Sequence, residues 1–297
     1  NIPAWLLKES ADLLANPVSD ILNSSYRECN LPPSWKTADI VPIPKKNPPK
    51  DVNKDLRPIS LTPILSKIAE EFVVENHVKP AILAKIQKNQ FGAIPKSSTI
   101  HALISMVNNW AKNTDGNGAT TRVVLFDFRK AFDLIDHNIL ASKIATLNIP
   151  HKIECWIIDF LKHRKQRVKL AQNCKSEWRD IPAGVPQGTK LGPWLFLLMI
   201  DDIDVTSTDT WKFVDDTTMA ECVERDGVST IQNAVTEFSE KALANKFQLN
   251  ESKCKELRVS FAKTDPQFEQ VIVNDKPLEI VQHAKLLGLN LSSDLKW

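Results

Sequence analysis

Two apolar, strand-like runs in this chain end in carboxylates, and this pattern limits its fold and chemistry more than any other feature. Asp127 follows the run 123–126, and the pair Asp215 and Asp216 follows the run 211–214. Strand ends hold side chains rigidly, so three acids converging there would repel one another unless cations lay between them. Mg²⁺ prefers carboxylates together with substrate phosphates, and two such ions about 3.5–4 Å apart serve phosphoryl transfer. The alternative is that the Asp-Asp pair is only a turn between two strands.

Length and composition indicate a globular chain. Its 297 residues can bury a sizeable core and form one large or two ordinary domains. The hydrophobic content of 42% and the charged content of 25% are typical of soluble proteins. The longest apolar run, Leu191–Ile200, is much shorter than the roughly 20 residues that cross a bilayer, so we expect no membrane partner. The chain begins with Asn rather than Met, which favours a piece of a longer polypeptide.

The cysteines favour a reducing compartment. There are 5 of them, an odd number, widely spaced and without a Cys-x-x-Cys pair. This pattern argues against a disulfide framework and against a structural zinc site.

Hydrophobic periodicity predicts helices and strands mixed irregularly along the chain, which favours an α+β fold over a doubly wound sheet. Repeated prolines at 32–49 predict extended loops. The predicted strands are 121–128, a pair within 166–182, and a hairpin at 211–222 with the Asp-Asp pair at its tip. The predicted helices are 3–29, 63–88, 98–113, 137–147, 151–163, 190–204 and 226–246.

Charge is distributed unevenly, although the net charge is only +2. Residues 162–169 contain five Lys or Arg and no acid, whereas residues 201–226 contain nine acids and two basic residues. A basic run can follow a phosphate backbone, so the pattern predicts that Arg164, Lys165 and Arg167 contact nucleic acid. The alternative, equally favoured, is a solvated surface.

Six segments, in order along the chain, resemble the motifs of one family: the reverse transcriptases of non-LTR, LINE-like retrotransposons. Each match is weak alone, but the shared order makes coincidence improbable. The segments are Leu56–Leu61, Gln90–Thr99, Val124–His137, Ala183–Phe196, Phe213–Asp216 and Leu286–Leu291. Two departures from the family are Phe128-Arg129, where many relatives have an aliphatic residue and Ser, and Phe213-Val214, where many have Tyr-Ala.

The resemblance implies a right-hand polymerase fold with palm and fingers, the thumb not included. The implied activity is RNA-directed DNA polymerisation with two Mg²⁺ ions. The implied divisions are an N-terminal extension with fingers, the first palm motif, a fingers/palm insertion with the basic strand pair, the second and third palm motifs, and a palm end with primer-grip-like strands. Their boundaries are 1–120, 121–137, 138–182, 183–262 and 263–297.

The resemblance also implies roles for charged residues. Lys253 matches a lysine that protonates pyrophosphate, although an exposed lysine without a role is the stronger reading. Asp133 and Asp136 fall where the next helix begins, where an acid serves as a cap, so we leave them out of the metal site. The implied metal ligands and catalytic acids are Asp127, Asp215 and Asp216.

Substrate contacts are implied at five positions. Arg57 precedes a proline, is therefore held extended, and would bind the triphosphate as a bidentate fork. Phe132 would block a ribose 2′-OH, with Phe128 beside it, and its alternative is a core phenylalanine. Gln187 and Gly188 would contact the incoming nucleotide, and their alternative is a plain loop.

The implied partners are an RNA template, a DNA primer and a dNTP, with an endonuclease upstream and a thumb downstream in the longer polypeptide. The implied location is intracellular, in cytoplasm and nucleus. Two alternatives stay open. One is a non-catalytic RNA-binding remnant of the same fold. The other is an RNA-dependent RNA polymerase or maturase, against which Phe132 argues because a bulky ring there rejects ribonucleotides.

Overall fold

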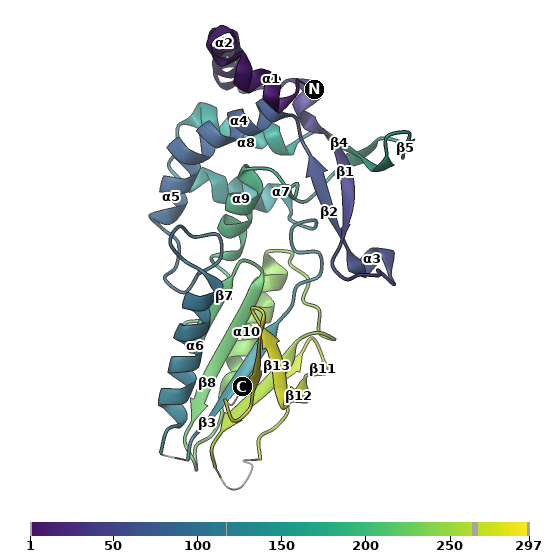
Figure 1. Cartoon of the computed structure of the whole chain (residues 1–297). Helices are drawn as coiled ribbons and strands as arrows, with labels where there is room; N and C mark the ends of the chain where they lie inside the picture. Colours follow the sequence, from purple (N-terminus) through teal and green to yellow (C-terminus); the bar gives the residue numbers. More distant parts are fainter. Residues whose placement is uncertain (1, 117, 263–266, 296–297) are drawn as a thin grey trace. The chain divides into compact units, whose positions relative to one another are not determined.

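The computed structural model describes residues 2–116, 118–262 and 267–295 (Figure 1). The chain forms two compact units, and each unit is built from two separate stretches of sequence. Unit 1 comprises Asn1–Lys85 and Phe132–Met199, and unit 2 comprises Ile86–Ala131 and Ile200–Trp297. In this division the stretch Ile86–Ala131 packs with Ile200–Trp297 rather than with the N-terminal helices.

A five-stranded sheet forms the centre of unit 2. Strand β3 (Thr120–Phe126) lies in its middle, and six of its seven residues are buried, as expected for a strand covered on both faces. The sheet order is β12-β9-β3-β8-β7, and β3 pairs antiparallel with both of its neighbours. The other strands are β7 (Asp209–Phe213), β8 (Asp216–Val223), β9 (Lys255–Ser260) and β12 (Glu279–Val281).

The two faces of this sheet pack against different helices. Alternate side chains of a strand point to opposite faces. Val123 therefore joins the core of α6 (Thr99–Thr114), which runs along one face in Figure 1. Phe126 instead packs 4.3 Å from the ring of Phe238 in α10 (Ile231–Ala244). Two short hairpins complete the unit: β10 (Ile272–Val273) with β11 (Lys276–Pro277), and β13 (His283–Leu286) with β14 (Leu289–Ser292).

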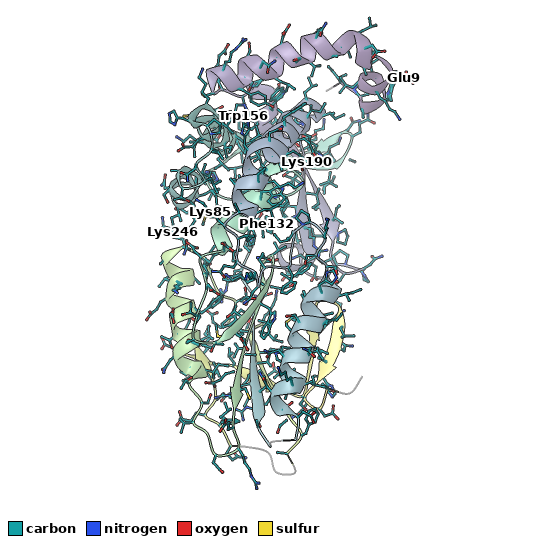
Figure 2. All side chains as sticks on the ribbon, turned by 90° about the vertical axis from the view of Figure 1, so that its left-hand side faces the viewer. Glu9, Lys85, Phe132, Trp156, Lys190 and Lys246 are labelled. Atoms are coloured by element: carbon teal, nitrogen blue, oxygen red, sulfur yellow. The ribbon has the colours of Figure 1, made fainter. Side chains whose placement is uncertain are left out.

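Unit 1 contains a layer of helices around one buried aromatic cluster. Trp156, labelled in Figure 2, is fully buried, donates to Ser25 Oγ at 2.8 Å, and meets Tyr26 edge to face. Helix α9 (Leu191–Ile200) is apolar all round and is therefore buried. The remaining helices are α1 (Ala4–Glu9), α2 (Ala11–Glu28), α4 (Ile64–Val73), α5 (Lys79–Leu83), α7 (His137–Ala145) and α8 (His151–Leu161).

Two helix predictions differ in detail from the structure. The single helix predicted at 3–29 is two helices, α1 and α2, which break at Ser10. The helix predicted at 63–88 runs through α4 and α5, but a π-helical turn, Val74–Val78, joins them. Among the described residues, no helix combines the length and apolarity that crossing a bilayer requires.

The prediction of extended loops at 32–49 is wrong for residues 37–44, which form a strand. After a short 3₁₀ turn (Pro33–Lys36), β1 (Thr37–Pro44) pairs antiparallel with β2 (Leu56–Leu61) and parallel with β4 (Arg164–Ala171). The pairing with β4 covers only Thr37 to Ile40, so Pro42 and Pro44 lie beyond it. Proline is tolerated where a strand has an open edge and its N–H is not needed. The smaller elements are α3 (Val52–Asp55), β5 (Cys174–Lys175) and β6 (Arg179–Ile181).

Candidate active site

The sheet register of unit 2 brings the predicted acids to one edge. Phe126, the last residue of β3, pairs with Thr217 of β8. The next residue outward on each strand is Asp127 and Asp216, so both leave the sheet at the same end. Phe213 pairs with Asp216 across a two-residue turn, Val214–Asp215. This turn places Asp215 at the hairpin tip.

An unusual backbone supports this hairpin tip. Val214 has φ of 60°, a left-handed conformation that is strained for a β-branched residue. The buried side chain of Gln90 holds it, because Oε1 accepts from Val214 N at 3.1 Å and from Gly92 N at 2.9 Å. A Cβ on Gly92 would lie 2.3 Å from Val214 N, so only glycine fits. Gln90 lies in a recognised motif, but the sequence did not show that it buttresses the turn.

The acids create an electrostatic cost at this edge. Loss of hydration around the carboxyl, and then repulsion from Asp215 and Asp127, raise the pKa of Asp216 to about 6. The residue keeps an exposed side at the start of β8, so a cation could reach it from solvent. Within 2–116, 118–262 and 267–295, however, no three His, Cys, Asp or Glu side chains are close enough to hold one metal ion.

Asp127 is held by the segment that precedes β9. Asn250 Nδ2 donates to Asp127 Oδ2 at 2.7 Å, and the Asn250 N–H donates to the Asp127 carbonyl at 2.7 Å. Lys253 Nζ lies 3.4 Å from the same Oδ2, with 64% of its side chain exposed. The Asp127 N–H donates to the buried Cys254 Sγ at 3.4 Å, and burial raises the pKa of this thiol to about 11. Sequence reasoning named Lys253 here but missed Asn250.

In unit 1, the loop before α9 packs directly on β2. Ser60 N donates to Gln187 O at 2.8 Å, and Gln187 Nε2 donates to Asp133 Oδ1 at 3.3 Å. Gly188 has φ of 101°, and a Cβ there would lie 2.9 Å from Ser60 O. The close approach of loop and strand therefore requires glycine. Arg57 lies exposed on the same strand, so unit 1 joins three of the predicted substrate contacts in one framework.

A buried acid that the sequence did not indicate fixes the start of α9. Glu70 is fully buried, and its Oε2 accepts from Lys190 N at 2.7 Å and from Leu191 N at 3.2 Å. Ser66 Oγ donates to its other oxygen at 3.0 Å. Burial raises the pKa of Glu70, and the bonds to Leu191, Lys190 and Ser66 oppose that shift. Glu70 caps the start of α9 together with Thr189, whose Oγ1 accepts from Gly192 N at 3.1 Å.

Phe132 also belongs to unit 1, where its ring stacks on Phe196 of α9 at 4.2 Å and 12°. It is half-buried, so one part of the side chain packs while another stays exposed. Asp136 accepts from Asn138 N and Ile139 N at 2.9 and 3.0 Å, which confirms that it caps a helix.

The assignment of Phe128 to substrate binding is wrong for this structure. Its side chain is buried at 7% exposure, with ring centroids 6.1 Å from Phe238 and 5.3 Å from Phe247. Alternation along the strand sends Phe128 to the same face as Phe126, beneath α10, where it is core.

The assignment of Arg164 to nucleic-acid binding is also wrong. It is only 2% exposed, donates to Phe160 O at 3.0 Å and stacks over the Phe160 ring. Burial lowers the pKa of Arg164 to about 10, while Glu70 opposes this shift. Arg167 Nε pairs with Asp39 Oδ1 at 2.7 Å, and its guanidinium lies over the ring of Trp178. Part of its binding capacity is therefore already used within the protein. Lys165, with 56% of its side chain exposed, forms only a long surface ion pair with Asp180 at 3.8 Å among the described residues, so phosphate could still reach it.

Sequence comparison identifies the family. A profile described as "Reverse transcriptase (RNA-dependent DNA polymerase)" matches residues 43–291. The chain belongs to the reverse transcriptase family. The RNA-directed DNA polymerase from mobile element jockey of Drosophila melanogaster is 28% identical over 300 residues, which cover 97% of this chain and 32% of that protein. The probable RNA-directed DNA polymerase from transposon BS, also from Drosophila melanogaster, is 30% identical over 65% of this chain and 22% of that protein.

These reverse transcriptase relatives confirm the predicted resemblance to non-LTR retrotransposons. The chain spans about a third or less of the length of the curated relatives it matches. Among solved structures, apo telomerase from Candida tropicalis aligns with a TM-score of 0.57 at 12% identity, covering 95% of this chain and 53% of that chain. A version truncated from the C-terminal domain gives a TM-score of 0.55 over 95% of this chain and 59% of that chain. These likenesses confirm the α+β palm-and-fingers fold.

Proposed function

We propose that this chain is the core of a retrotransposon RNA-directed DNA polymerase. It would join a dNTP to the 3′-OH of a DNA primer paired with an RNA template. The observation that carries this proposal is the shared sheet edge of Asp127 and Asp216, with Asp215 in the turn between the strands. All three acids lie within the residues that match the reverse transcriptase profile.

The donor chemistry at this edge suits Mg²⁺. Burial, and then repulsion from Asp215 and Asp127, raise the pKa of Asp216, and a cation bound beside it would offset the repulsion. Mg²⁺ is usually held by one or two carboxylates, with water and substrate phosphates completing its shell, so a preformed cage of three acids is not required. Asp127, Asp215 and Asp216 would hold two ions, which when bound would stabilise the charge on the attacking and leaving oxygens.

The predicted substrate contacts of unit 1 would bind and orient the nucleotide. Arg57 is exposed and held in β2, where its planar fork suits a triphosphate. Gln187 and Gly188 would approach the nucleotide from the loop packed on that strand, and Phe132 would exclude a 2′-hydroxyl. The 3′-OH would lose its proton to solvent as its oxygen bonds to the α-phosphorus. As the bond from that phosphorus to the bridging oxygen breaks, Lys253 would give the departing pyrophosphate a proton. Its exposed ammonium beside Asp127 supports this role.

Template and primer would be bound through their phosphates, with Lys165 as one contact. β4 and β5 carry two further lysines, the half-buried Lys169 and the exposed Lys175. We propose that the longer polypeptide of which this chain is a piece supplies an endonuclease and a thumb, as the resemblance implies.

Primer extension on an RNA template with dNTPs and Mg²⁺ tests the function. Wild-type chain should extend the primer, and Asp215→Asn should abolish extension while the protein stays folded by circular dichroism. Asp209→Asn is the matched control at the other end of β7, where Asp209 accepts from Asn109 at 3.0 Å. RNA binding without extension by wild type would favour the non-catalytic alternative. Equal extension with ribonucleotides would favour the RNA polymerase alternative.

A further inference from the structure

We propose that Asn250 is a positioning residue for Asp127 and that Arg129 holds Asn250 in place. Together they would set how tightly the Asp127 carboxylate binds a divalent cation. The inference rests on the proposed function, because it assigns Asp127 to the metal site. It also gives a role to Arg129, whose side chain reaches Leu249 O and Glu251 on either side of Asn250.

The contact between Asn250 and Asp127 is made at two points. The side-chain amide donates to Asp127 Oδ2, and the backbone N–H donates to the Asp127 carbonyl, both at 2.7 Å. Ser252 Oγ donates to Asn250 Oδ1 at 3.0 Å, which fixes the amide with its N–H side toward the carboxylate. Asn250 therefore holds Asp127 at two atoms, its carboxylate through an oriented amide and its backbone carbonyl through the N–H.

Arg129 ties the same segment to the end of β3. Its backbone N–H donates to Gln248 O at 2.8 Å, and its Nε donates to Leu249 O at 3.1 Å. Its Nη2 lies 2.6 Å from Glu251 Oε2, while Glu251 Oε1 accepts from Asn274 Nδ2 at 2.9 Å. A serine at this position could make neither of the two guanidinium contacts. The contacts to Leu249 and Glu251 that flank Asn250 therefore depend on the arginine side chain.

The neighbouring lysine cannot replace this restraint. Lys253 reaches the same Oδ2, but most of its side chain is exposed and its positive charge competes with a cation. Asn250 is neutral, so it orients the carboxylate without cancelling its charge. Residues that orient a metal ligand in this way typically contribute about 10- to 100-fold in metal affinity or activity.

The experiment compares Asn250→Ala with Asn245→Ala, a control in the same unit whose amide only donates to Lys241 O. Mn²⁺ binding is measured by electron paramagnetic resonance, and primer extension is measured over a range of Mg²⁺. Asn250→Ala should weaken Mn²⁺ binding roughly tenfold. It should lower kcat at fixed Mg²⁺, regain activity as Mg²⁺ is raised, and leave the KM for dNTP nearly unchanged. Arg129→Ser should change the same quantities in the same direction, and Arg129→Lys should not restore them because lysine lacks the fork.

The outcomes separate the two proposals. If wild type binds Mn²⁺ and extends primers, but Asn250→Ala matches it in both, the positioning role is overturned and the function stands. If wild type neither binds Mn²⁺ nor extends primers, both fail. Should Asn250→Ala unfold, Asn250→Ser keeps a turn-forming residue at that place while its hydroxyl is too short to span the contact. Normal Mn²⁺ affinity in that variant would equally overturn the inference.

Discussion

Phe132 has a packing role and a proposed substrate role in the same side chain. Its ring stacks on Phe196, yet the residue remains half-exposed. Phe132→Val should therefore shift selectivity toward ribonucleotides by about 10²-fold, which corresponds to roughly 3 kcal/mol of lost steric exclusion. It should also cost about 1–3 kcal/mol of stability, because the stacked ring is removed.

Two measurements separate these effects: kcat/KM for rNTP and dNTP, and unfolding in urea. Phe132→Leu is the control, since it keeps more bulk at the same site. A loss of stability with unchanged selectivity would make Phe132 a core residue only.

The ionisation of Tyr26 can be followed by itself, because the chain has 1 tyrosine. It therefore allows a prediction of how stability depends on pH. Burial raises the pKa of Tyr26 from 10.0 to about 12, and its hydroxyl donates to Ala69 O at 2.9 Å. The folded-state pKa is above the unfolded value, so this group stabilises the fold below pH 10. That contribution is lost as the pH rises toward 12.

An absorbance titration of tyrosinate tests this. The native chain should titrate near 12, and the chain in urea should titrate near the ordinary value. Coincident curves for the two states would show that Tyr26 is solvated in the native protein.

At the scale of elements, Glu70 and Glu71 form a natural pair for comparison. Glu70 caps α9 from the core, whereas Glu71 meets Lys190 Nζ at 2.5 Å with 46% of its side chain exposed. Glu70→Ala should cost about 2–4 kcal/mol, since it leaves two buried N–H groups unpaired and removes the charge near the buried Arg164. Glu71→Ala should cost less than about 1 kcal/mol, as for other exposed pairs.

Urea unfolding of both variants provides the check, and Glu70→Gln should fall between them because an amide oxygen can still accept. Equal costs for Glu70→Ala and Glu71→Ala would mean that the cap contributes nothing beyond a surface ion pair.

At the scale of the whole molecule, the basic β4 region should act through phosphates rather than bases. Lys165→Gln should weaken RNA binding to a similar extent for all sequences, and should flatten the slope of log K against log salt by about 0.7–0.9. Arg164→Gln should instead destabilise the fold, because Arg164 is buried against Phe160.

Filter binding across a salt series measures the slope, and urea unfolding measures the stability of both variants. A slope unchanged by Lys165→Gln would assign this lysine to the solvated surface.

The sequence predicted most of the order of helices and strands. The hydrophobic periodicity and the turn residues that mark these elements depend on neighbouring positions in the chain. The strand at 120–126, the helix at 99–114 and the hairpin around Asp215 were all predicted within a few residues. Strand β1 was missed for a physical reason. Whether proline is tolerated depends on which edge of the strand is paired, and the partner strand β4 is more than a hundred residues away.

Motif spacing singled out the acids, the glycine at 188 and the phenylalanine at 132 that we propose faces the sugar, since these positions are defined along the chain. The side chains that hold them were not visible in that pattern. Gln90 reaches Val214, Glu70 reaches the start of α9, and Asn250 reaches Asp127, each across more than a hundred residues. The same holds for Phe128 and Arg164, whose chemistry alone suits a site but whose burial excludes it. Residue type and spacing identify which groups a reaction needs, whereas burial and long-range hydrogen bonds determine which of them are free to act.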